Sequence, residues 1–157
     1  MNEDYLDLLR ALIDNEARFL IVGAHALAVH GIPRATGDLD IWIDRAPGNV
    51  TRIWRALEVF GAPTTALGVT AQDLAQPDIV IQLGLPPRRI DLLTSVTGLD
   101  FVDAWSTRVE HDISGCAVPF LGRAALVANK RATGRLKDLA DLEALGEGLG
   151  RSEESGA

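Results

Sequence analysis

Apolar residues recur along the chain with two different spacings, and these predict an alternation of helices and strands. In residues 3–16 they stand three or four positions apart, as on one face of a helix. In residues 38–43, DLDIWI, they alternate with acids, as in a strand with one buried face. The continuous run FLIV at residues 19–22 indicates a buried strand.

Glycines and prolines mark the boundaries of the remaining elements. The predicted helices are 24–31, 47–60, 100–106, 122–132 and 135–145, and the predicted strands are 78–84, 88–94, 108–113 and 116–121. Residues 62–77 are expected to form a loop with at most one helical turn. This order predicts an α/β (α+β) single domain, with a mixed β-sheet flanked by helices and a helical C-terminus. We expect that domain to span residues 1–147, followed by a flexible polar tail at 148–157.

Composition and charge limit the cell compartment in which we expect the protein and the kind of ligand we expect it to bind. No apolar run approaches the roughly 20 residues that span a bilayer, and the acidic start MNEDYLDLLR is unlike a secretory signal. The single cysteine, Cys116, suits a reducing compartment, so we expect a cytoplasmic protein without membrane contact. The net charge of −7 argues against a protein that coats nucleic acid. Residues 113–137 nevertheless carry bases and no acid, which favours a phosphorylated small ligand or one end of an RNA.

Three aspartates stand on the polar faces of predicted strands. Asp38 and Asp40 are two positions apart and therefore point the same way, and Asp91 interrupts the apolar strand RRIDLL. Converging carboxylates repel one another unless a cation neutralises them, and ligands that offer only oxygen favour Mg²⁺ or Mn²⁺. Two such ions beside a phosphate are a known arrangement for nucleotidyl transfer.

A purely structural interpretation of the same aspartates is also open. Asp38 could cap a turn, Asp40 could pair with Arg34, and Asp91 could pair with Arg88 or Arg89. For a bare D-x-D motif this interpretation is the stronger of the two.

The context of the motif favours the metal site. FLIVGAHALAVHG followed by RATGDLDIWI resembles the nucleotidyltransferase superfamily that includes DNA polymerase beta: strand, glycine and small residue, short helix, then D-x-D, with a third acid on a later strand. HGIPRATGDLDI together with ANKRATGRLKDLADLEAL is similar to small bacterial nucleotidyltransferase-like proteins related to abortive-infection toxins. The resemblance covers about residues 18–145.

The resemblance implies roles for particular residues. Asp38, Asp40 and Asp91 would be the catalytic metal ligands. The nucleotide would contact Gly23, Ala24, Arg34, Thr36, Lys130 and Arg135. Ala24 departs from the Gly-Gly or Gly-Ser pair of the family and removes a hydroxyl contact to phosphate. A solvated helix face for Lys130, and turn chemistry for Arg34 and Thr36, stay open as alternatives.

The C-terminal helix carries Asp138 and Asp141, whose role the sequence leaves open. In the related toxins an acid near this motif matters for activity, whereas Lys137 and Asp141 also form an i,i+4 pair that suits a structural role. The packing stripe of this helix is expected to consist of its leucines, Leu136, Leu139, Leu142 and Leu145.

The main hypothesis is a metal-dependent nucleotidyltransferase that moves a nucleoside monophosphate from an NTP, ATP among them, to a hydroxyl of RNA, protein or a small molecule. By resemblance it could be the toxin of a toxin–antitoxin pair, with an antitoxin protein as partner. The alternative is a non-catalytic module with the same fold that binds a nucleotide or a partner. A metal-dependent phosphohydrolase would use the same acids with water as acceptor.

Overall fold

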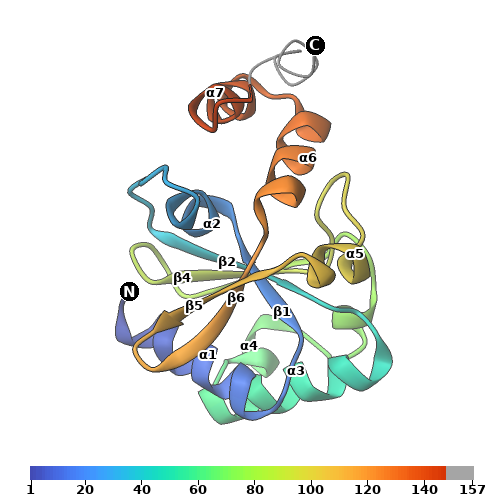
Figure 1. Ribbon diagram of the computed structural model, residues 1–157. Helices are drawn as coiled ribbons and strands as arrows, with labels where there is room; N and C mark the ends of the chain where they lie inside the picture. Colours follow the sequence, from blue (N-terminus) through green and yellow to red (C-terminus); the bar gives the residue numbers. More distant parts are fainter. Residues whose placement is uncertain (148–157) are drawn as a thin grey trace.

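Within residues 1–147, which the computed structural model describes, six strands form one mixed sheet (Figure 1). They are β1 (Phe19–Val22), β2 (Asp38–Ile43), β3 (Val80–Leu83), β4 (Arg89–Leu93), β5 (Val109–Ile113) and β6 (Cys116–Phe120). Their order across the sheet is β3-β4-β2-β1-β6-β5. The pairs β2/β4 and β1/β6 are parallel, and the pairs β1/β2, β3/β4 and β5/β6 are antiparallel. The expectation of a mixed sheet is confirmed.

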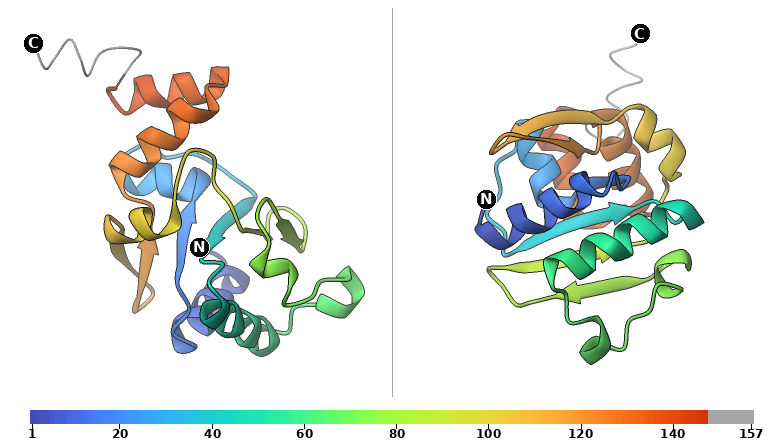
Figure 2. Two further views of the ribbon diagram at one scale, coloured as in Figure 1. Left: turned by 90° about the vertical axis from the view of Figure 1, so that its right-hand side faces the viewer. Right: turned by 90° about the horizontal axis from the view of Figure 1, so that it is seen from below.

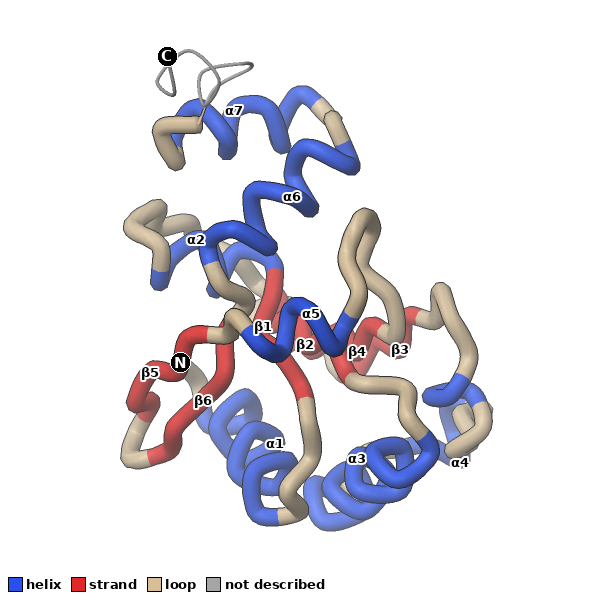
Figure 3. Tube along the Cα trace, turned by 45° about the vertical axis from the view of Figure 1, so that its right-hand side comes forward, coloured by secondary structure: helices blue, strands red, loops and turns tan. Residues whose placement is uncertain are grey.

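Helices cover both faces of the sheet, so that the fold has three layers (Figure 3). The helical segments are α1 (Glu3–Asp14), α2 (Gly23–Val29), α3 (Pro47–Phe60), α4 (Thr64–Leu67), the 3-10 turn η1 (Asp73–Ala75), α5 (Phe101–Ser106), α6 (Arg123–Thr133) and α7 (Leu136–Ala144). The helices α1 and α3 pack on one face, whereas α2, α5 and the start of α6 pack on the other. Helix α7 packs against α6, farther from the sheet (Figure 2).

The alternation in β2 separates its two faces as the sequence predicts. Leu39 and Ile41 are fully buried in the core under α1 and α3. Asp38, Asp40 and Trp42 therefore point to the opposite face of the sheet. There Trp42 is buried against the edge of Phe101, with ring centroids 5.0 Å apart. The strand thus presents two carboxylates on a face that its own tryptophan anchors.

The element boundaries follow from local chemistry. Pro47 occupies the first turn of α3, where its missing N–H costs nothing, and Gly61 ends the helix in the left-handed region with φ 84°. All predicted helices and strands are present within a few residues of their expected bounds. The segment 62–77 holds one more helical turn than expected, because both α4 and η1 form there.

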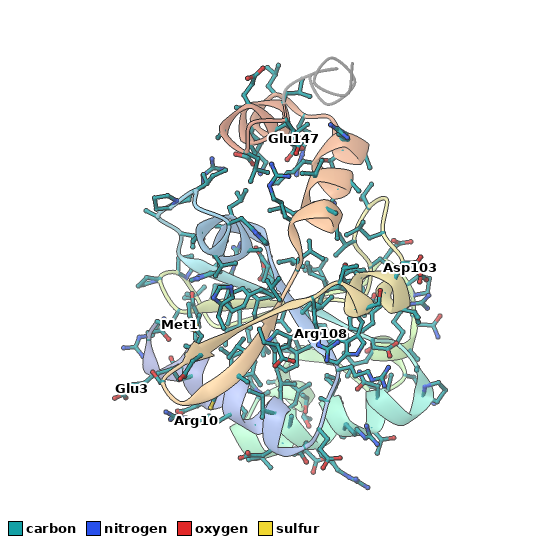
Figure 4. The ribbon with its side chains drawn as sticks, viewed as in Figure 1. Met1, Glu3, Arg10, Asp103, Arg108 and Glu147 are labelled. Carbon is teal, nitrogen blue, oxygen red and sulfur yellow. The ribbon has the colours of Figure 1, made fainter. Side chains whose placement is uncertain are left out.

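Helix α7 differs from its expected packing. Leu136 is 87% exposed, whereas Asp138 and Asp141 are buried together with Leu142. The predicted leucine stripe is therefore wrong for Leu136 but confirmed for Leu142, which is buried, and for Leu145, which packs against the core. The buried face of α7 also includes the two acids, which find cationic partners. Glu147 ties the end of this segment to α6 through ion pairs with Arg123 at 2.6 Å and Arg131 at 3.6 Å (Figure 4).

No helix in residues 1–147 combines the length and the apolar composition that crossing a bilayer requires. The predicted polar tail, residues 148–157, lies outside the described residues.

Candidate active site

Three aspartates meet on one face of the sheet, at the centre of two parallel strands. In the register of β2 with β4, Asp40 lies opposite Asp91 and Asp38 lies opposite Arg89. Side chains of residues opposite each other in neighbouring strands point to the same face. The fold therefore brings together the three acids that the sequence singled out, from positions about 50 residues apart.

Arg89 lies among these carboxylates. Its Nη2 donates to Asp38 Oδ2 at 2.7 Å, and its Nε lies 3.3 Å from Asp91 Oδ1. The structural interpretation of the acids is thus right for the pair Asp91–Arg89. It is wrong for Asp40, because Arg34 pairs with Asp141 on α7 instead.

Burial and mutual repulsion perturb this cluster. Burial, followed by the nearby charges of Asp91 and Asp38, raises the pKa of Asp40 from 3.8 to about 6. Burial also raises the pKa of Asp91, although the Arg89 guanidinium opposes this. Asp91 Oδ1 is buried and accepts no hydrogen bond from any described residue. The cluster carries more negative charge than Arg89 offsets, which is the condition under which a divalent cation stabilises such a site.

The donor set suits a hard divalent cation, but it is not preassembled around one. In residues 1–147 no three His, Cys, Asp or Glu side chains already have the arrangement of a complete metal site. Asp38 and Asp91 both contact the Arg89 guanidinium. The residues that could hold Mg²⁺ or Mn²⁺ are Asp38, Asp40 and Asp91, all through oxygen. Their assignment as metal ligands stays a prediction.

Gly23 makes room for the carboxylate of Asp40. The glycine follows β1 directly, at φ 69°, a backbone conformation that side chains disfavour. An added Cβ would lie 3.1 Å from Asp40 Cγ and would overlap Oδ2. The glycine of the motif is therefore needed twice, for its backbone conformation and for its close approach to the acid.

For the nucleotidyl transfer that the sequence predicts, we expect Gly23→Ala to reduce the rate by about 100-fold, because Asp40 must turn away from the added methyl group. Strain at the positive φ should lower stability by about 1 to 2 kcal/mol. Gly31→Ala is the matched control, since Gly31 has φ 94° but has nothing within 4 Å of an added Cβ. Equal activity losses in the two variants, measured with equal losses in Tm, would contradict a specific role for the contact with Asp40.

A cleft of about 420 Å³ opens over these strands and under the C-terminal helices. The predicted nucleotide contacts all line it: Gly23, Ala24, Arg34, Thr36, Lys130 and Arg135. Asp38 and Asp40 line it as well. Asp91 is not part of the wall and lies buried beside Arg89. The fold therefore places the predicted nucleotide contacts and two of the predicted metal ligands around one space.

Two buried acids of α7 hold the cations of the cleft. Asp141 accepts from Arg34 Nη2 at 2.6 Å and lies 3.0 Å from Lys130 Nζ. Asp138 accepts from Arg135 Nε at 2.8 Å and lies 3.4 Å from the same Lys130 Nζ. The alternatives of a solvated Lys130 and of a Lys137–Asp141 pair are both wrong, because Lys130 is buried and Asp141 pairs with Arg34 and Lys130.

The pKa values of the two acids reflect these contacts. Burial alone would raise the pKa of Asp138, but hydrogen bonds from Arg135 and Thr133 and the charge of Lys130 lower it strongly. Arg34 and Lys130 likewise lower the pKa of Asp141 against the effect of burial. Both carboxylates are therefore ionised at neutral pH and anchor the cations that face the cleft.

Several residues of the wall escaped sequence analysis. The end of β4 contributes Leu93, the segment after it contributes Ser95, Val96 and Thr97, and α6 contributes Asn129 and Thr133. Asn129 Nδ2 donates to Thr97 O at 2.9 Å and so joins the two segments. Asn129 and Thr133 stand within the C-terminal motif without a role assigned to them, whereas Ser95 and Thr97 stand in no motif, and only the fold places these polar residues beside the acids.

Comparison with known proteins places this geometry in a known fold. No family model and no curated protein matches the chain. A crystal structure from Thermotoga maritima, described as that of a "putative nucleotidyltransferase", matches with a TM-score of 0.54. The match covers 94% of this chain and 93% of the other, at 16% sequence identity. The chain has a nucleotidyltransferase fold.

The order of elements that the sequence motif requires is also the order found in this nucleotidyltransferase fold. The resemblance that rests on residues 18–145 requires a strand, a glycine, a short helix and an acidic strand, and these are β1, Gly23, α2 and β2. At this identity the likeness shows the fold, and the activity has to be argued from the residues of the cleft.

Proposed function

We propose that this protein is a nucleotidyltransferase that uses Mg²⁺ or Mn²⁺ to move a nucleoside monophosphate from an NTP to a hydroxyl group. The observation that carries the proposal is the composition of one cleft. It has the carboxylates of Asp38 and Asp40 on the strand side and the cations Arg34, Lys130 and Arg135 on the helical side. An NTP bound to a divalent ion has the complementary charge distribution, because its metal needs carboxylates and its phosphates need cations.

Each residue has a defined task in this proposal. Asp38 and Asp40 hold the ion, and Asp91 serves as a further ligand or as the base that receives the hydroxyl proton. When bound, the metal neutralises the phosphates and makes the α-phosphorus accessible to attack. The acceptor oxygen forms a bond to the α-phosphorus. At the same time the bond between the α-phosphorus and the bridging oxygen of the β-phosphate breaks, and pyrophosphate leaves.

The cations bind the triphosphate. Arg34 and Arg135 are exposed enough to meet a ligand. Arg34 donates to Asp141 through Nη2, and Arg135 donates to Asp138 through Nε and Nη2, so each guanidinium has further N–H groups to donate. Lys130, fixed between Asp138 and Asp141, contributes a positive charge from the buried wall. Ser95, Thr97 and Asn129 also line the cleft, and the proposal assigns their remaining hydrogen-bonding capacity to the nucleoside.

The proposal is tested with NTPs labelled at the α- or the γ-phosphate, incubated with the protein, Mg²⁺ and cell extract. We expect the α-label, but not the γ-label, to appear on an acceptor. Asp40→Asn should abolish this transfer, and Asp44→Asn, which changes an acid outside the cleft, should preserve it. Release of label only as inorganic phosphate would indicate a phosphohydrolase. A folded protein that transfers no α-label to any fraction would overturn the proposal.

The acceptor follows from the resemblance rather than from the cleft. Relatedness to abortive-infection toxins favours RNA or protein over a small molecule, and with it an antitoxin partner and a cytoplasmic location. These finer assignments stay predictions, and the fractionation of α-labelled acceptor from the same extract tests them.

A further inference from the structure

Arg89 is a cation within the cluster that the proposed function assigns to a divalent metal. It begins β4, two residues before Asp91 and opposite Asp38, so its side chain lies on the same face as the three acids. Its Nη2 lies 2.7 Å from Asp38 Oδ2 and 3.4 Å from Asp91 Oδ2, and its Nε lies 3.3 Å from Asp91 Oδ1. One guanidinium thus contacts two of the three predicted metal ligands.

The neighbouring arginine shows that these contacts belong to one position only. Arg88 precedes β4 and makes its ion pair elsewhere, with Asp4 of α1, at 3.2 Å and largely in solvent. Arg88 and Arg89 therefore have the same charge and adjacent positions, but only Arg89 reaches the carboxylate cluster.

Arg89 and a divalent ion would compete for the same oxygens. An ion bound through Asp38 and Asp91 takes the lone pairs that Arg89 now uses, and two cations at such short separations repel each other strongly. A metal that binds alone must therefore displace the guanidinium and leave it without a partner. A metal that arrives with a triphosphate brings phosphate oxygens that accept hydrogen bonds from the displaced guanidinium.

We propose that Arg89 is an internal counter-cation that keeps the carboxylate cluster from binding a divalent ion alone and couples metal binding to the arrival of the NTP. This inference rests on the proposed function, because it takes Asp38 and Asp91 as metal ligands. It makes Arg89 a positioning residue that holds the acids together in the metal-free protein. In the metal-free protein Arg89 neutralises Asp38 and Asp91, and the metal takes over this role when the nucleotide binds.

The test is Mn²⁺ binding, followed by the electron paramagnetic resonance signal of the free ion, for wild-type protein, Arg89→Met and Arg88→Met. We expect Arg89→Met to bind Mn²⁺ alone at least about tenfold more tightly than wild type, and Arg88→Met to bind like wild type. Preformed Mn²⁺–tripolyphosphate, a probe that is independent of the base, should bind to wild type much more tightly than Mn²⁺ does. The gain in affinity from tripolyphosphate should be smaller in Arg89→Met, because in that variant Mn²⁺ already binds in the absence of tripolyphosphate.

Thermal unfolding in the presence of a chelator gives a second readout. Arg89→Met should have a lower Tm than wild type at pH 7.5, and Mn²⁺ should restore it more than it raises the Tm of Arg88→Met. If Arg89→Met does not fold, Arg89→Gln, which keeps a donor but loses the charge, carries the same comparison.

The outcomes separate the two proposals. Equal or weaker Mn²⁺ binding by the Arg89 variant, with wild-type binding that depends on Asp40, would overturn the role of Arg89 and leave the metal site in place. If Asp40→Asn leaves Mn²⁺ binding unchanged in the wild-type, Arg89→Met and Arg88→Met backgrounds alike, the metal site is overturned, and the inference with it.

Discussion

Asp40→Asn is expected to abolish nucleotidyl transfer and, in the absence of metal, to make the protein more stable at pH 7.5. The pKa of Asp40 lies at about 6 in the folded protein, above its ordinary value of 3.8, because burial and two neighbouring acids disfavour its charge. Holding it ionised costs the folded state on the order of 2 to 3 kcal/mol at neutral pH. An amide of the same shape removes the charge and takes away one of the three predicted metal ligands.

The sign of the pH dependence follows from proton binding. Between pH 3.8 and about 6 the folded state binds more protons than the unfolded state, so the stability due to Asp40 falls as the pH rises through this range. The gain in Asp40→Asn should therefore be near zero at pH 4 and should be complete above pH 6. We expect it to raise the Tm by about 4 to 12 °C at pH 7.5, as measured by calorimetry in a chelator.

Two comparisons make this result specific. Asp44→Asn, just beyond the end of the same strand, is the control variant, because Asp44 lies outside the cluster and its Oδ1 accepts a hydrogen bond from the Ala46 N–H. Added Mn²⁺–tripolyphosphate should stabilise the wild type but not Asp40→Asn. Loss of stability in Asp40→Asn at pH 7.5 would show instead that Asp40 is held by a structural partner, and that the site does not need a cation.

Asp141→Asn is expected to destabilise the protein by about 2 to 4 kcal/mol, the cost of removing one partner from a buried ion pair. The carboxylate is 1% exposed and neutralises Arg34 from the other end of the chain and Lys130 from α6. The variant leaves the buried ammonium of Lys130 with Asp138 alone, at 3.4 Å. We expect a Tm lower by about 4 to 16 °C and weaker binding of NTP, because both cations lose their anchor.

This loss should depend on pH in the opposite direction to the effect of Asp40. The cations lower the pKa of Asp141 in the folded state, so its stabilisation is present above the ordinary carboxyl pKa. It is lost as the pH falls through the lowered pKa, so wild type and variant should converge in acid. Asp112→Asn is the control, because it makes an equal change at an exposed position of β5, where the carboxylate accepts a hydrogen bond from the Gly115 N–H of the turn.

A double-mutant cycle then tests whether the network is a unit. Lys130→Met should cost less stability in the Asp141→Asn background than in wild type, because the pair has already been broken. Additive losses in the cycle would mean that Lys130 and Asp141 stabilise the fold independently.

Most elements could be predicted because each depends on neighbours in the sequence. The alternation in DLDIWI separates Leu39 and Ile41 from Asp38 and Asp40 whatever the strand pairs with, since successive side chains point to opposite faces. The strand period also favours Arg89 over Arg88 as the partner of Asp91, because residues two apart share a face.

The sequence-based predictions that proved wrong concern charged residues that are buried in the structure. A stripe of leucines was expected on α7, but Leu136 is exposed while Asp138 and Asp141 are buried beside Leu142. The partners that make this burial favourable come from other elements. Arg34, 107 residues away from Asp141 in sequence, is one of them.

The sequence by itself determined the order of the elements, the acidic face of β2 and the glycine beside it, because these depend on periodicity and on backbone conformation at single residues. Only the tertiary structure decided that Asp91 lies opposite Asp40, that Arg89 contacts two acids of the cluster, and that Asp138 and Asp141 hold the cations of the cleft. The physical reason is that a charge is paired or unpaired according to what lies within a few ångströms of it, and the strand register and helix packing set those distances.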